Sequence, residues 1–135
     1  LLATVTDVGM APWDELHLFS APSLNAEWRA HPRNPVVADA RRSRPAGRVL
    51  RIGDRLVRPG QDCSRSYGRR IVLSSITTLT ETEYEERVIG TIEPTGQPGV
   101  TRTHCYTTDG DVEVLDGFER VARWSRRRPS SSGPA

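Results

Sequence analysis

The sequence lacks lysine, has only two cysteines and one methionine, and contains no long apolar run. No stretch is long enough to cross a bilayer as a helix, and no signal peptide is recognisable. The two cysteines, Cys63 and Cys105, exclude the multi-bridge framework of small secreted domains. One bridge is possible, and two free, buried thiols are the favoured interpretation. The chain starts without methionine inside a predicted strand, so we expect a truncated N-terminus.

Charge gives little sign of a nucleic-acid partner. All 19 basic residues are arginine, which we attribute to the codon bias of a GC-rich genome. The formal net charge is +2, and Arg126–Arg128 lie in the tail, so the rest of the chain is near neutral and shows no basic face for phosphate backbones. Hydrophobic residues make up 36% and the mean hydropathy is −0.53, which is low for a globular domain. We expect residues 120–135, which are rich in arginine and serine, to be largely disordered.

The clearest local signal is a hairpin in the middle of the chain. Two runs, Val49–Ile52 and Arg55–Arg58, flank Gly53-Asp54, and glycine first in a two-residue loop favours a type II′ turn. If the pairing continues without interruption, Arg44 falls opposite Cys63. Both faces of the hairpin carry apolar residues, which indicates a strand pair between neighbouring sheets.

Strand-type patterns predict further strands: apolar and polar residues alternate in some runs, and Arg69–Thr78 is rich in β-branched residues. These are Leu1–Thr6, Glu15–Ser20, Arg69–Thr78, Tyr84–Ile92, Arg102–Thr107 and Val112–Leu115. The last two form a second hairpin across Asp109-Gly110, and no long helix is expected, so the fold class is all-β. Residues 44–93 have the length and strand count of one four-stranded antiparallel propeller blade, and by that measure residues 1–119 hold about two and a half blades. A β-sandwich ranks second.

Several motifs carry a family resemblance. The run Trp28-Arg29-Ala30-His31-Pro32-Arg33-Asn34-Pro35-Val36 resembles a segment of five-bladed propellers in the arabinanase and invertase superfamily. Arg44-Pro45-Ala46-Gly47 and Gln61-Asp62-Cys63-Ser64, followed by Tyr67-Gly68, resemble the N-terminal domain of plant glucosamine inositolphosphorylceramide transferase and its bacterial relatives.

The resemblance covers residues 1–119 and implies a partial five-bladed β-propeller whose remaining blades belong to the parent chain. It implies a role in handling carbohydrate or a glycoconjugate, beside a separate glycosyltransferase domain. Related propeller glycosidases use carboxylates from several blades, including early ones, so any catalytic set would be incomplete in this chain. A bacterial parent would favour a cytoplasmic location.

The open end of the central hairpin supplies the polar candidates for ligand binding. The Arg44 guanidinium and the Gln61 amide can each bond two neighbouring sugar hydroxyls, and Asp62 can accept from them. Asp62 is also a candidate catalytic carboxylate. The alternative is an internal ion pair between Arg44 and Asp62 that braces the hairpin.

Other candidates lie outside the hairpin. Asp14 and Glu15 stand where a strand begins and could project a general acid into a pocket, although exposed turn carboxylates look the same. Trp13 and Tyr67 could stack on a sugar ring or pack between blades. His104 could reach the pocket. The three histidines show no metal-ligand spacing, and neither a metal nor another cofactor is expected.

Three function classes remain open at this stage. The leading one is a carbohydrate-recognising domain associated with sugar transfer or glycan modification. The second is part of an active glycosidase-like or glycosyl-transferring enzyme with axial carboxylates, which leaves the enzyme question undecided. The third is a structural docking module with no ligand at its axis.

Overall fold

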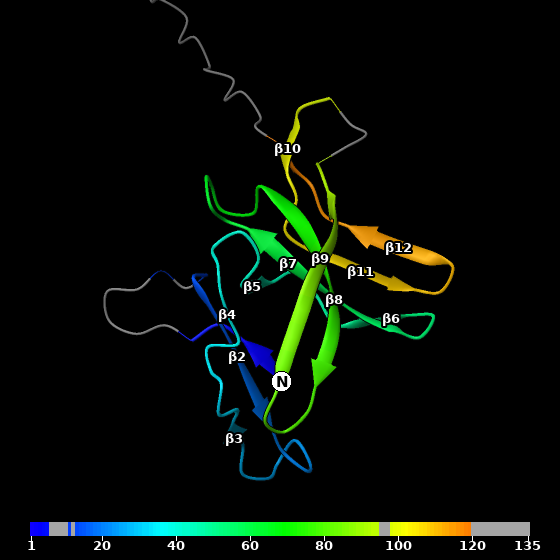
Figure 1. The fold of residues 1–135 in the computed structure, drawn as a ribbon. Helices are drawn as coiled ribbons and strands as arrows, with labels where there is room; N and C mark the ends of the chain where they lie inside the picture. Colours follow the sequence, from blue (N-terminus) through cyan, green and yellow to red (C-terminus); the bar gives the residue numbers. More distant parts are fainter. Residues whose placement is uncertain (6–10, 12, 95–97, 120–135) are drawn as a thin grey trace, which may run out of the picture.

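The computed structural model describes residues 1–5, 11, 13–94 and 98–119 (Figure 1). The predicted disordered tail, residues 120–135, lies outside the described residues. All regular structure in the described ranges is β. The strands are β1 (Leu2–Ala3), β2 (Glu15–Ser20), β3 (Arg29–Ala30), β4 (Val37–Ala38), β5 (Arg44–Pro45), β6 (Leu50–Ile52), β7 (Arg55–Asp62), β8 (Arg70–Leu79), β9 (Tyr84–Ile92), β10 (Val100–Arg102), β11 (Tyr106–Asp109), β12 (Val112–Leu115) and β13 (Phe118–Glu119).

The large sheet has the order β5-β7-β8-β9, with β6 continuing the edge beside β7. Strands β5 and β6 act as one interrupted strand, so the sheet is a four-stranded antiparallel meander, as predicted for residues 44–93. The turn at Gly53 is confirmed: Ile52 pairs with Arg55 and Gly53 has a φ of 59°, as the first central residue of a type II′ turn requires. The short turn after β8 is held by Thr80, whose Oγ1 accepts from the Glu83 amide at 2.9 Å.

The predicted register of the central hairpin is wrong at its open end. Arg44 pairs with Gln61, not with Cys63. Between Pro45 and Leu50 the chain advances five residues, while β7 advances three, from Gly60 to Val57. The extra length lets a second hairpin attach there, because the Tyr106 amide donates to the Ala46 carbonyl at 2.8 Å.

That second hairpin, β11–β12, turns one residue later than predicted. Asp109 pairs with Val112, so Gly110-Asp111 forms the turn, and Gly110 has the positive φ of 64°. Gly47 is where β11 meets the large sheet, since a Cβ at this position would overlap the Tyr106 carbonyl oxygen. In Figure 1 the hairpin lies on one side of β8 and β9, and the strands β1 to β4 lie on the other.

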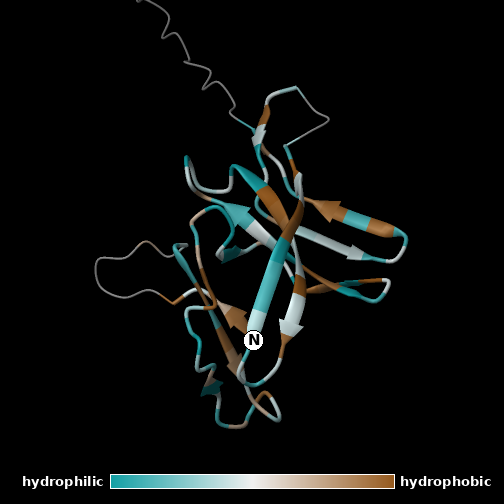
Figure 2. Cartoon of the chain, viewed as in Figure 1, coloured by the Kyte–Doolittle hydropathy of each residue, from teal (hydrophilic) through white to brown (hydrophobic). Residues whose placement is uncertain are grey.

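A small sheet, built on β2, packs against the large one. Strand β2 pairs with β1, β3 and β4, and Leu2 of β1 lies opposite Leu18 of β2. The core cluster joins the two sheets, and its members are Leu16, Leu18, Val37 and Tyr84, with Leu2, Val36 and Ile76 packed around them. Figure 2 shows hydrophobic segments in both β1 and β8. Burying a side chain such as Leu16 contributes about 1.5–3 kcal/mol.

The loop between β2 and β4 is fixed by Asn34. Its Oδ1 accepts from the Leu18 amide at 2.8 Å and its Nδ2 donates to the Leu18 carbonyl at 2.9 Å. His31 braces the same loop by accepting from the Arg33 amide at 3.2 Å through Nδ1. The His-Pro-x-Asn-Pro motif is therefore a structural element here. The all-β antiparallel prediction is confirmed, and the sheets formed by the described residues are open.

Candidate functional site

Four of the predicted ligand-binding residues meet at one end of the large sheet, around Tyr67. The Arg44 guanidinium carbon lies 5.1 Å from the centroid of the Tyr67 ring. Ring centroids of Trp13 and His104 lie 6.1 Å and 5.1 Å from that of Tyr67. We call these four residues the aromatic surface. They come from the turn before β2, from β5, from the loop after β7 and from the loop after β10.

Tyr67 stays accessible in this arrangement. The residue is 41% exposed, and its hydroxyl accepts from Arg44 Nη2 at 3.2 Å. Arg44 therefore contacts both the face and the hydroxyl of the ring, which holds the phenol in place. A partly exposed aromatic ring with a guanidinium beside it combines apolar contact area with polar N–H groups, the two kinds of surface that a sugar contacts.

Asp62, a predicted ligand-binding and catalytic candidate, faces the protein interior instead. It is 1% exposed; its Oδ1 accepts from the Ser64 amide and hydroxyl, and its Oδ2 accepts from Arg70 Nε at 2.9 Å. Burial acts to raise the pKa of Asp62, but the hydrogen bonds from Ser64 and Arg70 outweigh it and lower the pKa. The ionised carboxylate thus braces the turn from β7 to β8, and its ion-pair partners are Arg70 and, at 3.6 Å, Arg69 rather than Arg44.

Gln61 is also turned inward. Its Nε2 donates to the Pro45 carbonyl at 3.3 Å, and its Oε1 accepts from the Cys63 thiol at 3.8 Å. Burial, the largest cause, raises the pKa of Cys63, so the thiol stays protonated. Cys63 is buried as expected, whereas Cys105 is exposed, and both are free thiols.

The other two carboxylate candidates lie at the start of β2. Glu15 contacts His17, with 3.1 Å between Oε2 and the ring Nε2. Asp14 follows Trp13 of the aromatic surface and lies near enough to Cys63 to add to the rise in its pKa, as Asp62 also does. Asp14 is therefore the carboxylate candidate that adjoins the aromatic surface.

Sequence reasoning missed Asp116, which positions His104. Asp116 Oδ1 accepts from the His104 amide at 2.6 Å and from the Cys105 amide at 2.8 Å. Its Oδ2 lies 3.0 Å from His104 Nδ1. Burial acts to raise the pKa of Asp116, and these hydrogen bonds outweigh it and lower the pKa. An Asp-Gly pair after a strand predicts only a turn, so no local signal pointed to this role.

Gly68 brings the His104 ring close to Tyr67. It has a φ of 61°, and a Cβ there would overlap the His104 ring. The Thr103 amide donates to the Gly68 carbonyl at 3.1 Å, which ties the two loops together. Glycine at this position thus permits both the left-handed backbone and the contact between the loops.

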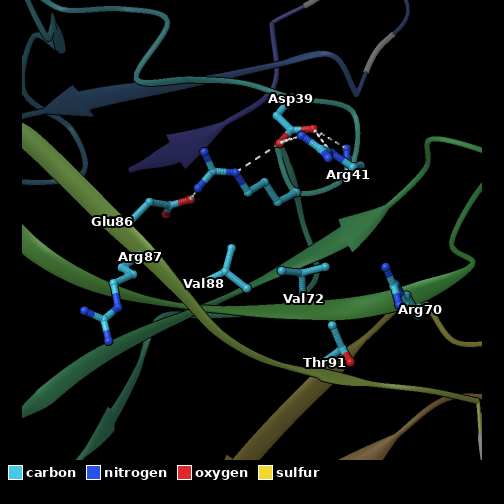
Figure 3. A pocket seen from close by; sticks show the side chains of 9 residues that line it. Asp39, Arg41, Arg70, Val72, Glu86, Arg87, Val88 and Thr91 are labelled. Carbon is cyan, nitrogen blue, oxygen red and sulfur yellow. Dashed lines mark hydrogen bonds and ion pairs between the residues drawn. The ribbon is translucent and has the colours of Figure 1, made fainter.

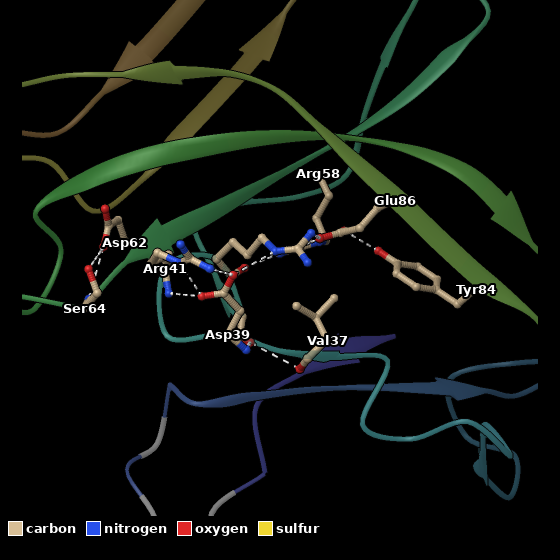
Figure 4. A network of polar contacts seen from close by, with 10 residues as sticks. Val37, Asp39, Arg41, Arg58, Asp62, Ser64, Tyr84 and Glu86 are labelled. Carbon is tan, nitrogen blue, oxygen red and sulfur yellow. Dashed lines mark hydrogen bonds and ion pairs between the residues drawn. The ribbon is translucent and has the colours of Figure 1, made fainter.

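A second polar group of residues, absent from the predicted site, lies between the two sheets (Figure 4). Arg58 donates to Glu86 through Nε at 2.7 Å and Nη2 at 2.6 Å, and the Tyr84 hydroxyl donates to Glu86 at 2.7 Å. The side chains of Arg58 and Glu86 are 1% and 3% exposed. We call Arg42, Arg58, Tyr84 and Glu86 the buried network, because Arg42 also donates to Glu86, at 3.0 Å.

A groove of about 470 Å³ lies beside this network (Figure 3). Its lining residues are Asp39, Arg41, Arg42, Arg70, Val72, Glu86, Arg87, Val88 and Thr91. Arg41 and Arg42 pair with Asp39, and Arg70 pairs with Asp62 and Glu93. The groove contains none of the predicted site residues, and its arginines are largely neutralised by carboxylates, so the aromatic surface is the better candidate site.

The described residues contain neither a cluster of metal ligands nor a membrane-spanning helix. No group of three or more His, Cys, Asp or Glu residues in the described ranges could hold a metal ion. No helix of the described chain is long and apolar enough to cross a membrane.

Comparison with known proteins gives one family. The model of the family described as glucosamine inositolphosphorylceramide transferase 1, N-terminal, matches residues 2–97. This segment includes Trp13, Arg44 and Tyr67, and it ends before His104.

Curated proteins from plants are similar to part of this chain. The glucosamine inositolphosphorylceramide transferase 1 of Oryza sativa subsp. japonica is 38% identical over 74 residues, which is 53% of this chain and 10% of the relative. The protein of that name from Arabidopsis thaliana is 34% identical over 83 residues, or 60% of this chain and 11% of the relative. The match thus spans about a tenth of the length of these relatives. No solved structure matches.

Proposed function

Since the chain belongs to the family of glucosamine inositolphosphorylceramide transferase N-terminal domains, we propose that it is a carbohydrate-recognising domain associated with sugar transfer. The aromatic surface is its binding site. The name of the plant relatives, glucosamine inositolphosphorylceramide transferase 1, includes glucosamine, so glucosamine is the first sugar to test.

The observation that carries the proposal is the arrangement around Tyr67. Three aromatic rings and one guanidinium from four separate parts of the chain converge there, and the central residue is 41% exposed. Tyr67 is held in place by these neighbours while part of its surface stays open to solvent. A half-exposed ring with charged and polar neighbours has the properties of a stacking platform for a pyranose.

The large sheet also supports the propeller expectation. A four-stranded antiparallel meander is the form of one propeller blade. We propose that β5 to β9 form such a blade of a five-bladed propeller in the parent protein. The aromatic surface then lies at the end of the blade where the interrupted edge strand begins.

Binding of glucosamine by the 135-residue chain tests the proposed function. Titration followed by ligand-observed NMR gives the dissociation constant of wild type, Tyr67→Ala and the control Trp28→Ala. Trp28 is also an exposed aromatic residue, 38% exposed, and hydrogen-bonds to Leu24 rather than to the site. We expect Tyr67→Ala to weaken binding about five- to tenfold, from the loss of roughly 1 kcal/mol of stacking. Equal affinity of the two variants, or no binding by wild type, would contradict the proposal.

A further inference from the structure

We propose that Asp116 is a positioning residue that fixes His104 as a hydrogen-bond acceptor at Nε2, so that the aromatic surface selects a ligand whose hydroxyl donates beside the Tyr67 ring. This inference rests on the proposed function for the sugar, but the state of the His104 ring can be measured without one.

The orientation of Asp116 is determined by the backbone. Oδ1 accepts from two consecutive amides, those of His104 and Cys105, at 2.6 and 2.8 Å. The Thr103 hydroxyl adds a third contact to Oδ1 at 3.3 Å. The carboxylate cannot rotate without breaking these bonds, so Oδ2 stays 3.0 Å from His104 Nδ1.

The contact between Oδ2 and Nδ1 decides which nitrogen of the neutral ring carries the proton. Hydrogen bonds from the backbone lower the pKa of Asp116, so its carboxylate is ionised and can only accept. The proton in the contact must then be on Nδ1. In a neutral imidazole with Nδ1 protonated, Nε2 has a free lone pair and accepts a hydrogen bond.

The ring of His104 lies next to the Tyr67 ring of the proposed sugar platform. The two centroids are 5.1 Å apart, the rings are tilted by 36° to each other, and the His104 side chain is 19% exposed. A Cβ on Gly68 would overlap the His104 ring, with Cδ2 nearest and Nε2 at 2.7 Å, so only glycine leaves room for the ring here. No residue in the described ranges donates a hydrogen bond to Nε2. A sugar stacked on Tyr67 can therefore supply the donor from a hydroxyl at its edge.

The substitution Asp116→Asn reverses this polarity with little change of shape. The oxygen of the introduced amide can keep the two backbone bonds, whereas its NH₂ group faces Nδ1 and donates to it. The ring proton then moves to Nε2, which becomes a donor. The control is Asp111→Asn, the same change at an exposed position in the β11–β12 turn.

The first measurement is the tautomer of His104 in the sugar-free chain, from ¹⁵N NMR of the imidazole nitrogens at a pH where the ring is neutral. We expect the Nδ1-protonated form in wild type and Asp111→Asn, and the Nε2-protonated form in Asp116→Asn. Wild type with the proton on Nε2, or no change in Asp116→Asn, would overturn the inference.

The second measurement is glucosamine affinity. We expect about a tenfold loss in Asp116→Asn, equivalent to about 1.4 kcal/mol, and no loss in Asp111→Asn, because the sugar hydroxyl then meets a donor in place of its acceptor. His104→Ala, which leaves the backbone bonds of Asp116 intact, should lose affinity similarly and serves if Asp116→Asn does not fold. Unchanged affinity in both variants would overturn the inference while leaving the proposed function intact. Absence of binding by wild type would contradict the proposed function, and the tautomer spectrum would still decide the role of Asp116.

Discussion

Two arginines of the large sheet, Arg44 and Arg58, have opposite surroundings. Arg58 of β7 is 1% exposed and forms two hydrogen bonds with the Glu86 carboxylate. Arg44 of β5 lies over the ring of Tyr67, which is 41% exposed. The buried network satisfies its charges within the protein, whereas at the aromatic surface Tyr67 stays partly exposed. A charged side chain alone therefore does not indicate a ligand-binding site. Whether its partner is a buried carboxylate or an exposed ring distinguishes the two regions.

The buried network keeps its charges because its members compensate one another. Burial alone would lower the pKa of Arg58 and raise that of Glu86, but their pairing reverses both shifts, so both groups stay charged. Burial and the bond to Glu86 raise the pKa of Tyr84, which therefore remains a donor. The polar groups of the buried network thus bond mainly to one another, at the contact between the two sheets. Few of them are left to bond a ligand.

The largest effect is expected from breaking the buried network. Arg58→Met should lower the free energy of unfolding by about 3–5 kcal/mol, because Glu86 is left buried without its main partner. Urea unfolding measures this, with the exposed Arg51→Met as control, for which we expect a change within about 0.5 kcal/mol. The double change Arg58→Met with Glu86→Leu should recover much of the loss. A single-variant cost no greater than that of the control would show that the pair is not buried in solution.

The next largest effect is expected at Gly68. Comparison with Gly53 separates the cost of disturbing the contact with the His104 loop from the cost of a left-handed backbone. Gly68 and Gly53 have nearly the same φ, 61° and 59°, but a Cβ at Gly68 would overlap His104 and one at Gly53 would meet nothing within 4 Å. Gly53→Ala should cost about 1 kcal/mol for its left-handed backbone. Gly68→Ala should cost about 2–4 kcal/mol, because the His104 loop must also move.

Thermal unfolding of the two glycine variants compares these costs directly. Glucosamine titration adds a functional readout, since displacement of His104 should weaken binding in Gly68→Ala only. Equal unfolding costs and equal affinities would mean that the loops are not in contact at this point.

A smaller effect is expected from acid. The pKa of Glu86 is held below 4.5 in the folded chain, so its stabilising contribution is fully present above pH 4.5 and is lost as the pH falls through the folded value. Glu86→Gln should therefore lose stability less steeply than wild type below pH 4.5, by at most about 1.4 kcal/mol per pH unit. Urea unfolding from pH 6 to pH 3 gives both slopes. Parallel curves would show that Glu86 does not titrate with folding.

The sequence predicted the parts of the fold that depend on neighbours in the chain. β-Branched residues located the long strand β8, alternation located β9, and Gly53 specified its turn. The register at Arg44 failed because the extra residues before Leu50 are accommodated by a contact with Tyr106, far along the chain. No short-range pattern reports such a contact.

The candidate site likewise has residues that the sequence suggested correctly and residues whose position it did not reveal. Trp13 and Tyr67 were suggested as rings that could stack on a sugar, and His104 as a residue that could reach the pocket. The structure brings the three together. Gln61 and Asp62 looked equally suitable, but local bonds turn both inward. The role of Asp116 depends on two loops meeting in space, and its spacing in the sequence shows nothing of it.

The most direct test of the contrast between the two regions is a map of amide chemical shifts as glucosamine is added to the ¹⁵N-labelled chain. Our account predicts shifts at Trp13, Arg44, Tyr67, Gly68 and His104, with none at Arg58 or Glu86. Shifts centred on Arg41, Arg70 and Glu86 would instead place the sugar in the groove beside the buried network and contradict the account.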